Sequence, residues 1–269
     1  ERPAGALLPA SMSPLRVNLW SGPRNVSTAL MYSFAQRADT RVVDEPLYAH
    51  YLRVSGADHP GRDDVLRSLD QDGERVVRDV ILGPCDREVI FFKQMAHHLV
   101  ELDRSFLGRC ANVLLTRDPR EMVPSLALHL AEPTMRDTGY AMLVDLHDEL
   151  RSMGQDPPVL DARELLLDPR SVLGELCRRL GLRFDEAMLR WQSGPRPEDG
   201  VWAPHWYDNV HRSTGFEPYR PPPAPQPGMG QTRAPVSERV RSLIEECTPY
   251  YDRLLECAIA ARGASRATS

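Results

Sequence analysis

Residues 21–28 combine the side chains and the backbone that hold an anion. The segment reads S-G-P-R-N-V-S-T, between an apolar alternation at 15–20 and a helical pattern at 27–36. Its Gly, Pro and Asn break regular structure, so we predict a strand, a turn and a helix in that order. The N–H groups at the helix start, its hydroxyls and the Arg24 guanidinium would then face one phosphate. The same residues also fit a capped helix after a turn.

A second segment carries an arginine and a serine eight positions apart. It reads R-D-P-R-E-M-V-P-S and follows the apolar run 112–116, which predicts a strand. Pro119 suits the first turn of a helix. Arg117 would then end the strand and Ser125 would lie on the helix, where both could hold a further phosphate. An exposed arginine before a Pro-initiated helix gives the same pattern.

Carboxylate and ammonium groups follow two further predicted strands. The sequence D-E-P-L-Y begins at Asp44, and V-I-F-F-K ends at Lys93. A carboxylate here could take a proton from an acceptor hydroxyl; Glu45 is the first candidate and Asp44 the reserve. Lys93 could stabilise negative charge as it develops on a leaving group. His98 is a second candidate base, although it also fits a hydrogen-bonded histidine at a helix start.

Strands that alternate with helices predict an α/β fold with a central, mostly parallel sheet flanked by helices. In such sheets ligands bind beyond the carboxyl ends of the strands, which is where the charged groups above lie. The remaining predicted elements are strands at 41–44 and 159–161 and helices at 119–130, 139–153, 171–180 and 237–261.

The two phosphate segments together resemble the nucleotide-binding motifs of the sulfotransferase family that uses 3′-phosphoadenosine-5′-phosphosulfate (PAPS). Arg24, Ser27 and Thr28 match the motif for the 5′-phosphosulfate, and Arg117 and Ser125 match the motif for the 3′-phosphate. Segments 162–182 and 248–254 resemble later parts of the family, whereas similarity is weak at 50–88 and 192–235. The resemblance implies a single-domain, P-loop sulfotransferase-like fold of the bacterial type.

The resemblance also implies the chemistry: in-line transfer of a sulfonate group from PAPS to a hydroxyl or amine of a small molecule, with adenosine 3′,5′-bisphosphate (PAP) as product and no metal. Met95 stands where cytosolic members of the family have the histidine that acts as the catalytic base. The R-K-G sequence that the family usually has in the late loop is absent near Arg212. The implied catalytic residues are Glu45, Lys93, Arg24 and His98. The implied cofactor-binding residues are Arg24, Asn25, Val26, Ser27, Thr28, Ala29, Arg117, Ser125 and Arg212.

The net charge, the cysteines and the lengths of the apolar runs limit the partners and the cellular location that we expect for this protein. A net charge of −5 and a pI near 5.9 argue against a nucleic-acid partner. The five scattered cysteines suggest reduced thiols, and the apolar runs are too short to span a membrane, so we expect a cytoplasmic protein. Residues 1–13 are interpreted as an upstream extension or expression remnant, and 14–269 as one domain. Its Pro/Gly-rich loop at 192–235 would be a lid, a binding loop or a disordered segment.

Two other functions stay open on the sequence alone. A P-loop kinase of a small molecule would need Mg²⁺ and usually the loop lysine, but the segment at 21–28 lacks both that lysine and the second glycine of G-x-x-x-x-G-K-[ST]. A catalytically degenerate sulfotransferase-like binding protein would keep the phosphate segments and lose the base. The acceptor and the oligomeric state are not encoded in any motif found here.

Overall fold

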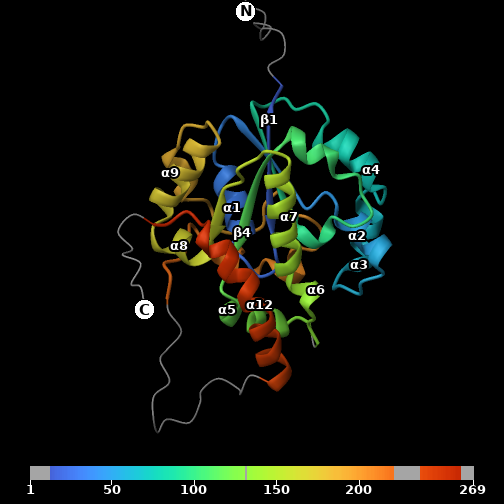
Figure 1. The fold of residues 1–269 in the computed structure, drawn as a ribbon. Helices are drawn as coiled ribbons and strands as arrows, with labels where there is room; N and C mark the ends of the chain where they lie inside the picture. Colours follow the sequence, from blue (N-terminus) through green and yellow to red (C-terminus); the bar gives the residue numbers. More distant parts are fainter. Residues whose placement is uncertain (1–12, 131, 221–236, 262–269) are drawn as a thin grey trace, which may run out of the picture.

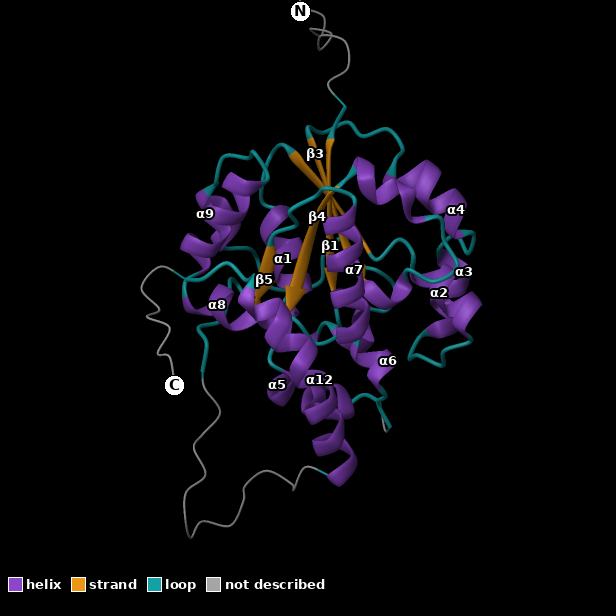
Figure 2. Cartoon of the chain, viewed as in Figure 1, coloured by secondary structure: helices purple, strands orange, loops and turns teal. Residues whose placement is uncertain are grey.

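The structure, a computed structural model, describes residues 13–130, 132–220 and 237–261. A five-stranded parallel sheet lies at its centre in the order β2-β3-β1-β4-β5 (Figures 1 and 2). The prediction of a central parallel sheet flanked by helices is confirmed. The strands are β1 (Leu15–Ser21), β2 (Thr40–Asp44), β3 (Val89–Met95), β4 (Ala111–Thr116) and β5 (Val159–Asp161).

Alternating side chains of the inner strands enter two separate cores. Leu19 and Phe91 point into one hydrophobic cluster, whereas Trp20 and Phe92, one position later, point into the other. All four are at most 1% exposed. This two-residue alternation, with both faces buried, explains why the strands read as nearly continuous apolar runs.

Helices cover both faces of the sheet. In Figure 1, α1, α8 and α9 lie on one side, and α7 with α2, α3 and α4 on the other. The α-helices are α1 (Ser27–Phe34), α2 (Tyr48–Ser55), α3 (Arg62–Ser68), α4 (Gly73–Val76), α5 (Pro119–Ala127), α6 (Met135–Thr138), α7 (Tyr140–Ser152), α8 (Ala162–Leu167), α9 (Pro169–Arg179), α10 (Ala203–Trp206), α11 (Asp208–Arg212) and α12 (Glu238–Glu256). The other helical turns are η1 (Val77–Ile81), η2 (Ala96–His98), η3 (Arg104–Arg109) and η4 (Glu186–Leu189).

The predicted helices and strands recur with shifts of a few residues at their ends. The largest shift is in the last helix, which ends at Glu256, five residues before the predicted end. The segment predicted as a long loop contains α10 and α11 in its described part. Its remainder at 221–235, and residues 1–12 of the extension predicted at 1–13, lie outside the described residues. Within the described ranges, no helix is both long enough and apolar enough to cross a membrane.

Candidate functional site

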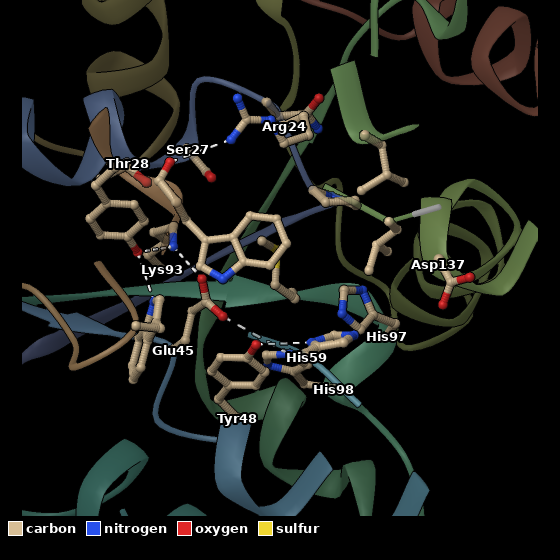
Figure 3. A pocket seen from close by; sticks show the side chains of 18 residues that line it. Arg24, Ser27, Thr28, Glu45, Tyr48, His59, Lys93, His97, His98 and Asp137 are labelled. Atoms are coloured by element: carbon tan, nitrogen blue, oxygen red, sulfur yellow. Dashed lines mark hydrogen bonds and ion pairs between the residues drawn. The ribbon is translucent and has the colours of Figure 1, made fainter. Parts of the chain in front are cut away.

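An open pocket of about 710 Å³ lies beyond the carboxyl ends of β1, β2 and β3 (Figure 3). The parallel arrangement brings these ends to one edge, so groups far apart in the sequence meet there. The lining comes from the β1–α1 loop with the first turn of α1, the turn after β2, and the second half of β3 with η2. Residues in or next to α2, α5, α6 and α10 complete it. Of the predicted catalytic residues, Arg24, Glu45, Lys93 and His98 all line this pocket.

The β1–α1 loop presents uncapped backbone amides. Helix α1 begins at Ser27 after Val26, and no side chain caps its first turn. The alternative interpretation, in which a side chain caps this helix, does not apply here. The backbone N–H groups at the start of α1 can therefore bind an anion. Arg24 adopts a left-handed backbone with a φ of 55°, which only the surrounding contacts can hold in a non-glycine residue. Asn25 donates to the Leu115 carbonyl at 3.2 Å and fixes the loop on β4.

Arg24 and Arg117 join the two predicted phosphate segments physically. The Arg24 Nε donates to the Ser125 hydroxyl at 3.1 Å, and the Arg117 Nη1 donates to the Arg24 carbonyl at 2.9 Å. Burial, and secondarily the neighbouring Arg117, lower the pKa of Arg24. Arg117 has a carboxylate partner, Glu121, at 3.1 Å. Arg24 has no carboxylate partner in the described chain, so positive charge remains uncompensated where the two segments meet.

A second pocket, of about 760 Å³, adjoins the first on the other side of this loop. Both pockets are lined by Arg24, by Thr28, and by Trp206 and Tyr207 at the end of α10. The second also includes Arg117, and its further lining comes from 213–217 and from Val26 and Ala29 of the first phosphate segment. The two pockets therefore meet at the β1–α1 loop beneath α10.

Arg212 lies apart from this arrangement. It is exposed on α11, its guanidinium donates to the Asn209 side chain at 2.7 Å, and it lines neither pocket. The neighbouring Asn209 and Ser213 do line the second pocket. Residues of the late loop therefore line the second pocket, but Arg212 is not among them.

Lys93 and two carboxylates form a buried network at the base of the first pocket. Asp44 pairs with Lys93 in the β2–β3 register, which brings their side chains together. The Lys93 ammonium donates to Asp44 at 3.0 Å, to the Tyr207 hydroxyl at 2.7 Å, and to Glu45. Tyr207 in turn donates to the second Asp44 oxygen at 2.7 Å. Each charged member is less than a tenth exposed, so the pairing compensates charges that burial would otherwise penalise.

This network sets the protonation of Glu45. Burial raises its pKa to about 7, with Lys93 opposing and Asp44 reinforcing the shift. Burial lowers the pKa of Lys93, but the two carboxylates outweigh it and the net shift is upward. One ammonium shared between two carboxylates thus stays charged, while Glu45 titrates close to neutral pH. A group with that pKa can accept a proton at physiological pH.

The histidines of η2 lie in the same pocket but have a different protonation. Burial and the neighbouring His97 lower the pKa of His98 well below its ordinary value. Its Nε2 lies 4.0 Å from Glu45 Oε2. Burial likewise lowers the pKa of His97 to about 3. Both rings are therefore neutral at physiological pH, and His98 is a much weaker proton acceptor than Glu45.

Tyr207 is the member of the network that the sequence did not reveal. It lies in the segment predicted as a long loop, and it contacts Lys93 from 114 positions away. Trp202 supports it by donating to its hydroxyl at 3.1 Å. Asp44, the reserve candidate for the base, accepts from Lys93 with one oxygen and from Tyr207 with the other. The signal available in the sequence was that Lys93 and Asp44 each stand at the end of an apolar predicted strand. In the β2–β3 register these two residues lie opposite each other.

Comparison with known proteins assigns the chain to a class. A family model described as the sulfotransferase domain matches residues 15–234. In Arabidopsis thaliana, branched-chain-amino-acid aminotransferase-like protein 2 is 38% identical over 242 residues, covering 90% of this chain and 41% of that protein. The aminotransferase-like protein 1 of the same plant is 45% identical over 204 residues, covering 76% and 37%. The chain thus spans about two fifths of the length of these curated relatives.

Solved structures show a more distant similarity. The sulfotransferase domain from the curacin biosynthetic pathway has a TM-score of 0.49 and 15% identity, covering 88% of this chain and 99% of that one. The sulfotransferase domain from the Synechococcus PCC 7002 olefin synthase has a TM-score of 0.49 and 17% identity, covering 89% and 97%. The family assignment therefore depends on the sequence match, which covers most of the chain.

Proposed function

The chain belongs to the sulfotransferase domain family, and from this premise we propose that it transfers a sulfonate group from PAPS to a hydroxyl or amine of a small molecule. The observation that carries the proposal is the junction of Arg24, Ser125 and Arg117, where Arg24 lines both pockets and has no carboxylate partner among the described residues. One pocket would receive the nucleotide and the other the acceptor. The sulfonate would pass between them beside the α1 N-terminus.

The donor would be held from both of its charged ends. The α1 amides, the Ser27 and Thr28 hydroxyls and the Arg24 guanidinium suit the 5′-phosphosulfate. Arg117 and Ser125 suit the 3′-phosphate, and Arg117 would exchange part of its Glu121 contact for the phosphate. Val26 and Ala29 give the second pocket an apolar side for the nucleoside.

The acceptor would be activated from the opposite wall. Glu45 would take the acceptor proton as the acceptor oxygen or nitrogen forms its bond to sulfur and the bond from sulfur to the bridging oxygen breaks. Lys93 would stabilise the negative charge that develops on the leaving phosphate oxygen. With the acceptor and the leaving group on opposite sides of the sulfur, the transfer is an in-line displacement without a covalent enzyme intermediate.

The donor site is tested by Arg117→Ala. We expect PAP to bind at least about tenfold more weakly in calorimetry, because a hydrogen bond to a charged group contributes about 1.5–3 kcal/mol. Arg120→Ala is the matched control, since Arg120 lies one turn further on, is 74% exposed and pairs with Asp118. Unchanged PAP affinity in Arg117→Ala would remove this arginine from the donor site.

Two further measurements separate the functions that the sequence left open. A rise in melting temperature with PAP in the absence of Mg²⁺ supports the sulfotransferase. A rise only with ATP and Mg²⁺ together, and not with PAP, supports a kinase. Transfer of radiolabelled sulfonate from PAPS to a panel of alcohols, phenols and amines then tests catalysis. PAP binding without transfer to any acceptor would leave a binding protein.

A further inference from the structure

Building on the proposed function, we infer that the acceptor has an aromatic or apolar body with its nucleophilic group at one end and a cationic amine at the other. Apart from Arg24 and Lys93, which belong to the proposed donor site and catalytic network, the first pocket is built from neutral, mostly flat walls between two carboxylates, Glu45 and Asp137. Figure 3 shows these two carboxylates on opposite sides of the pocket, with the rings between them.

The walls favour a flat or apolar body. The Tyr48 and His98 rings stack with centroids 4.9 Å apart and an interplanar angle of 12°. Trp202 meets Tyr48 edge-on at 5.2 Å, and Leu126 and Leu130 of the α5 region contribute aliphatic surface. A ring inserted here would bury apolar area and make the stacked and edge-to-face contacts that aromatic groups prefer.

The histidines add hydrogen-bonding capacity without positive charge. The Nδ1 atoms of His97 and His98 are buried and have no partner among the described residues. Burial keeps both rings neutral by lowering their pKa values, and it also lowers the pKa of His59. A polar group of the acceptor can satisfy these nitrogens, whereas an anionic group finds no imidazolium to pair with.

The charged lining residues are Arg24, Lys93, Glu45 and Asp137. The first three belong to the donor loop and the catalytic network described above. Asp137 forms no ion pair within the described part of the chain. Its neighbour Arg136 is exposed, lies over the Tyr51 ring at 5.9 Å and does not line the pocket.

Asp137 is held in a fixed position by its own helix. One of its oxygens accepts from the Thr134 amide at 2.8 Å and from the Thr134 hydroxyl at 2.7 Å, in a capping box at the start of α6. Its negative charge partly offsets the lowering of the pKa values of His59 and His97, so its field reaches the pocket rings. A rigid carboxylate in a half-buried apolar pocket favours a cation over a neutral or anionic group.

The test compares three phenols that differ at the end remote from the hydroxyl. Tyramine is cationic, 4-ethylphenol is neutral and 3-(4-hydroxyphenyl)propionate is anionic. Their affinities are measured by calorimetry, on the PAP-saturated protein and again without PAP, so that the ranking does not depend on donor binding. We expect tyramine to bind at least about tenfold more tightly than 4-ethylphenol, and the propionate to bind most weakly.

Asp137→Asn is the decisive variant, because asparagine keeps an oxygen for the Thr134 contacts and removes the charge. It should bring tyramine to the affinity of 4-ethylphenol and leave 4-ethylphenol unchanged. Asp145→Asn, an exposed carboxylate on α7, is the matched control and should preserve the ranking. Equal affinities of the three phenols, tighter binding of the propionate, or no binding of any phenol would overturn the inference. Sulfonate transfer to 4-ethylphenol as efficient as to tyramine would uphold the proposed function and still overturn this inference.

Discussion

The two oxygens of Glu45 have different surroundings, so we expect only one of them to accept a proton. Oε1 is bound by the Lys93 ammonium, whereas Oε2 faces the pocket beside His98 at 4.0 Å. Glu45 has a positive φ of 37° and lies at the turn directly after β2. In this position its side chain accepts a hydrogen bond from the Lys93 ammonium. Oε2 is therefore the atom that we expect to accept the proton of the substrate.

Glu45→Gln tests this assignment through pH dependence. With a pKa of about 7, Glu45 is protonated in acid, so kcat should fall as pH decreases through about 7. The glutamine variant should lose about 100-fold or more in kcat, and any residual rate should lack this acidic limb. A limb that persists in Glu45→Gln would assign the base to another group, whereas His98→Asn should keep the limb.

Tyr207→Phe tests the support that the late loop gives to the same network. The change removes an acceptor from Lys93 and a donor from Asp44, both buried, and should lower the free energy of unfolding by about 1–3 kcal/mol in urea titrations. The negative charge of Asp44 would then be less shielded, so the acidic limb of Glu45 should move to higher pH. Tyr219→Phe removes a partly buried hydroxyl that donates to Glu121, outside this network, and should leave the acidic limb in place. An unshifted limb would mean that Tyr207 is only structural.

At the scale of elements, the β1–α1 loop is fixed by a close contact with the α6–α7 junction. A Cβ on Gly22 would lie 2.4 Å from the Thr138 carbonyl oxygen, which is closer than real Cβ contacts. On the other side of the contact, Gly139 has a φ of +76° and allows the chain to turn from α6 into α7. Because the clashing atom belongs to the backbone, neither side can yield by a change of rotamer. The donor loop and the helix that carries Asp137 are therefore set against each other.

Gly22→Ala should displace one of these elements. We expect a lower melting temperature, together with weaker PAP binding in calorimetry, because the amides of α1 lose their alignment. Gly174→Ala in α9 is the matched control: its Cβ meets nothing within 4 Å, and alanine favours a helix more than glycine does. Full PAP affinity in Gly22→Ala would show that the loop tolerates the shift.

The elements that the sequence predicted well are those whose burial is strong and local. Strands β3 and β4 contain continuous apolar runs, β1 is an apolar alternation, and α5 is marked by Asp118 as N-cap and Pro119 in its first turn. Helices α2 and α3 were missed because they are short and their residues lack a clear apolar periodicity. Helix α2 is ended by Gly56 with a φ of 67°, a signal that is legible only after the helix is known.

Across the whole molecule, the site depends on contacts that no local pattern contains. The Tyr207–Lys93 and Arg24–Ser125 contacts join residues 114 and 101 positions apart. The ends of the strands could be predicted from the order of strands and helices. The sequence therefore indicated at which edge of the sheet the site lies and which charged residues stand near that edge. Which side chain of the late loop reaches that edge depends on how the loop folds back, so Tyr207 was not predictable.

Asp161 joins the last strand to the last helix and provides a test of global stability. Its Oδ1 accepts from the Arg163 and Glu164 amides at the start of α8, and its Oδ2 accepts from the Tyr251 hydroxyl of α12 at 3.2 Å. Burial raises its pKa from 3.8 to about 6. A carboxyl whose pKa is raised in the folded state stabilises the protein fully below the unfolded pKa, and this contribution is lost as pH rises through the folded pKa.

Asp161→Asn removes this titration. Relative to the variant, the wild type should lose about 3 kcal/mol of unfolding free energy between about pH 3.8 and pH 6, since each unit of pKa shift corresponds to about 1.4 kcal/mol. Denaturant titrations of both proteins at several pH values in this window give the difference. A difference that stays constant with pH would show that Asp161 ionises as freely in the folded chain as in the unfolded one.

The placement of the tryptophans gives the molecule a built-in optical signal. Of the four in the chain, Trp20 and Trp191 are buried in the hydrophobic cores, where they donate to Asn112 and Ser213. Trp202 lines only the first of the two pockets, and Trp206 lines both. A ligand in either pocket changes the surroundings of Trp206, whereas only a ligand in the first reaches Trp202. Emission from the unlabelled protein, recorded with either tryptophan replaced by phenylalanine, can therefore distinguish in real time which pocket fills first.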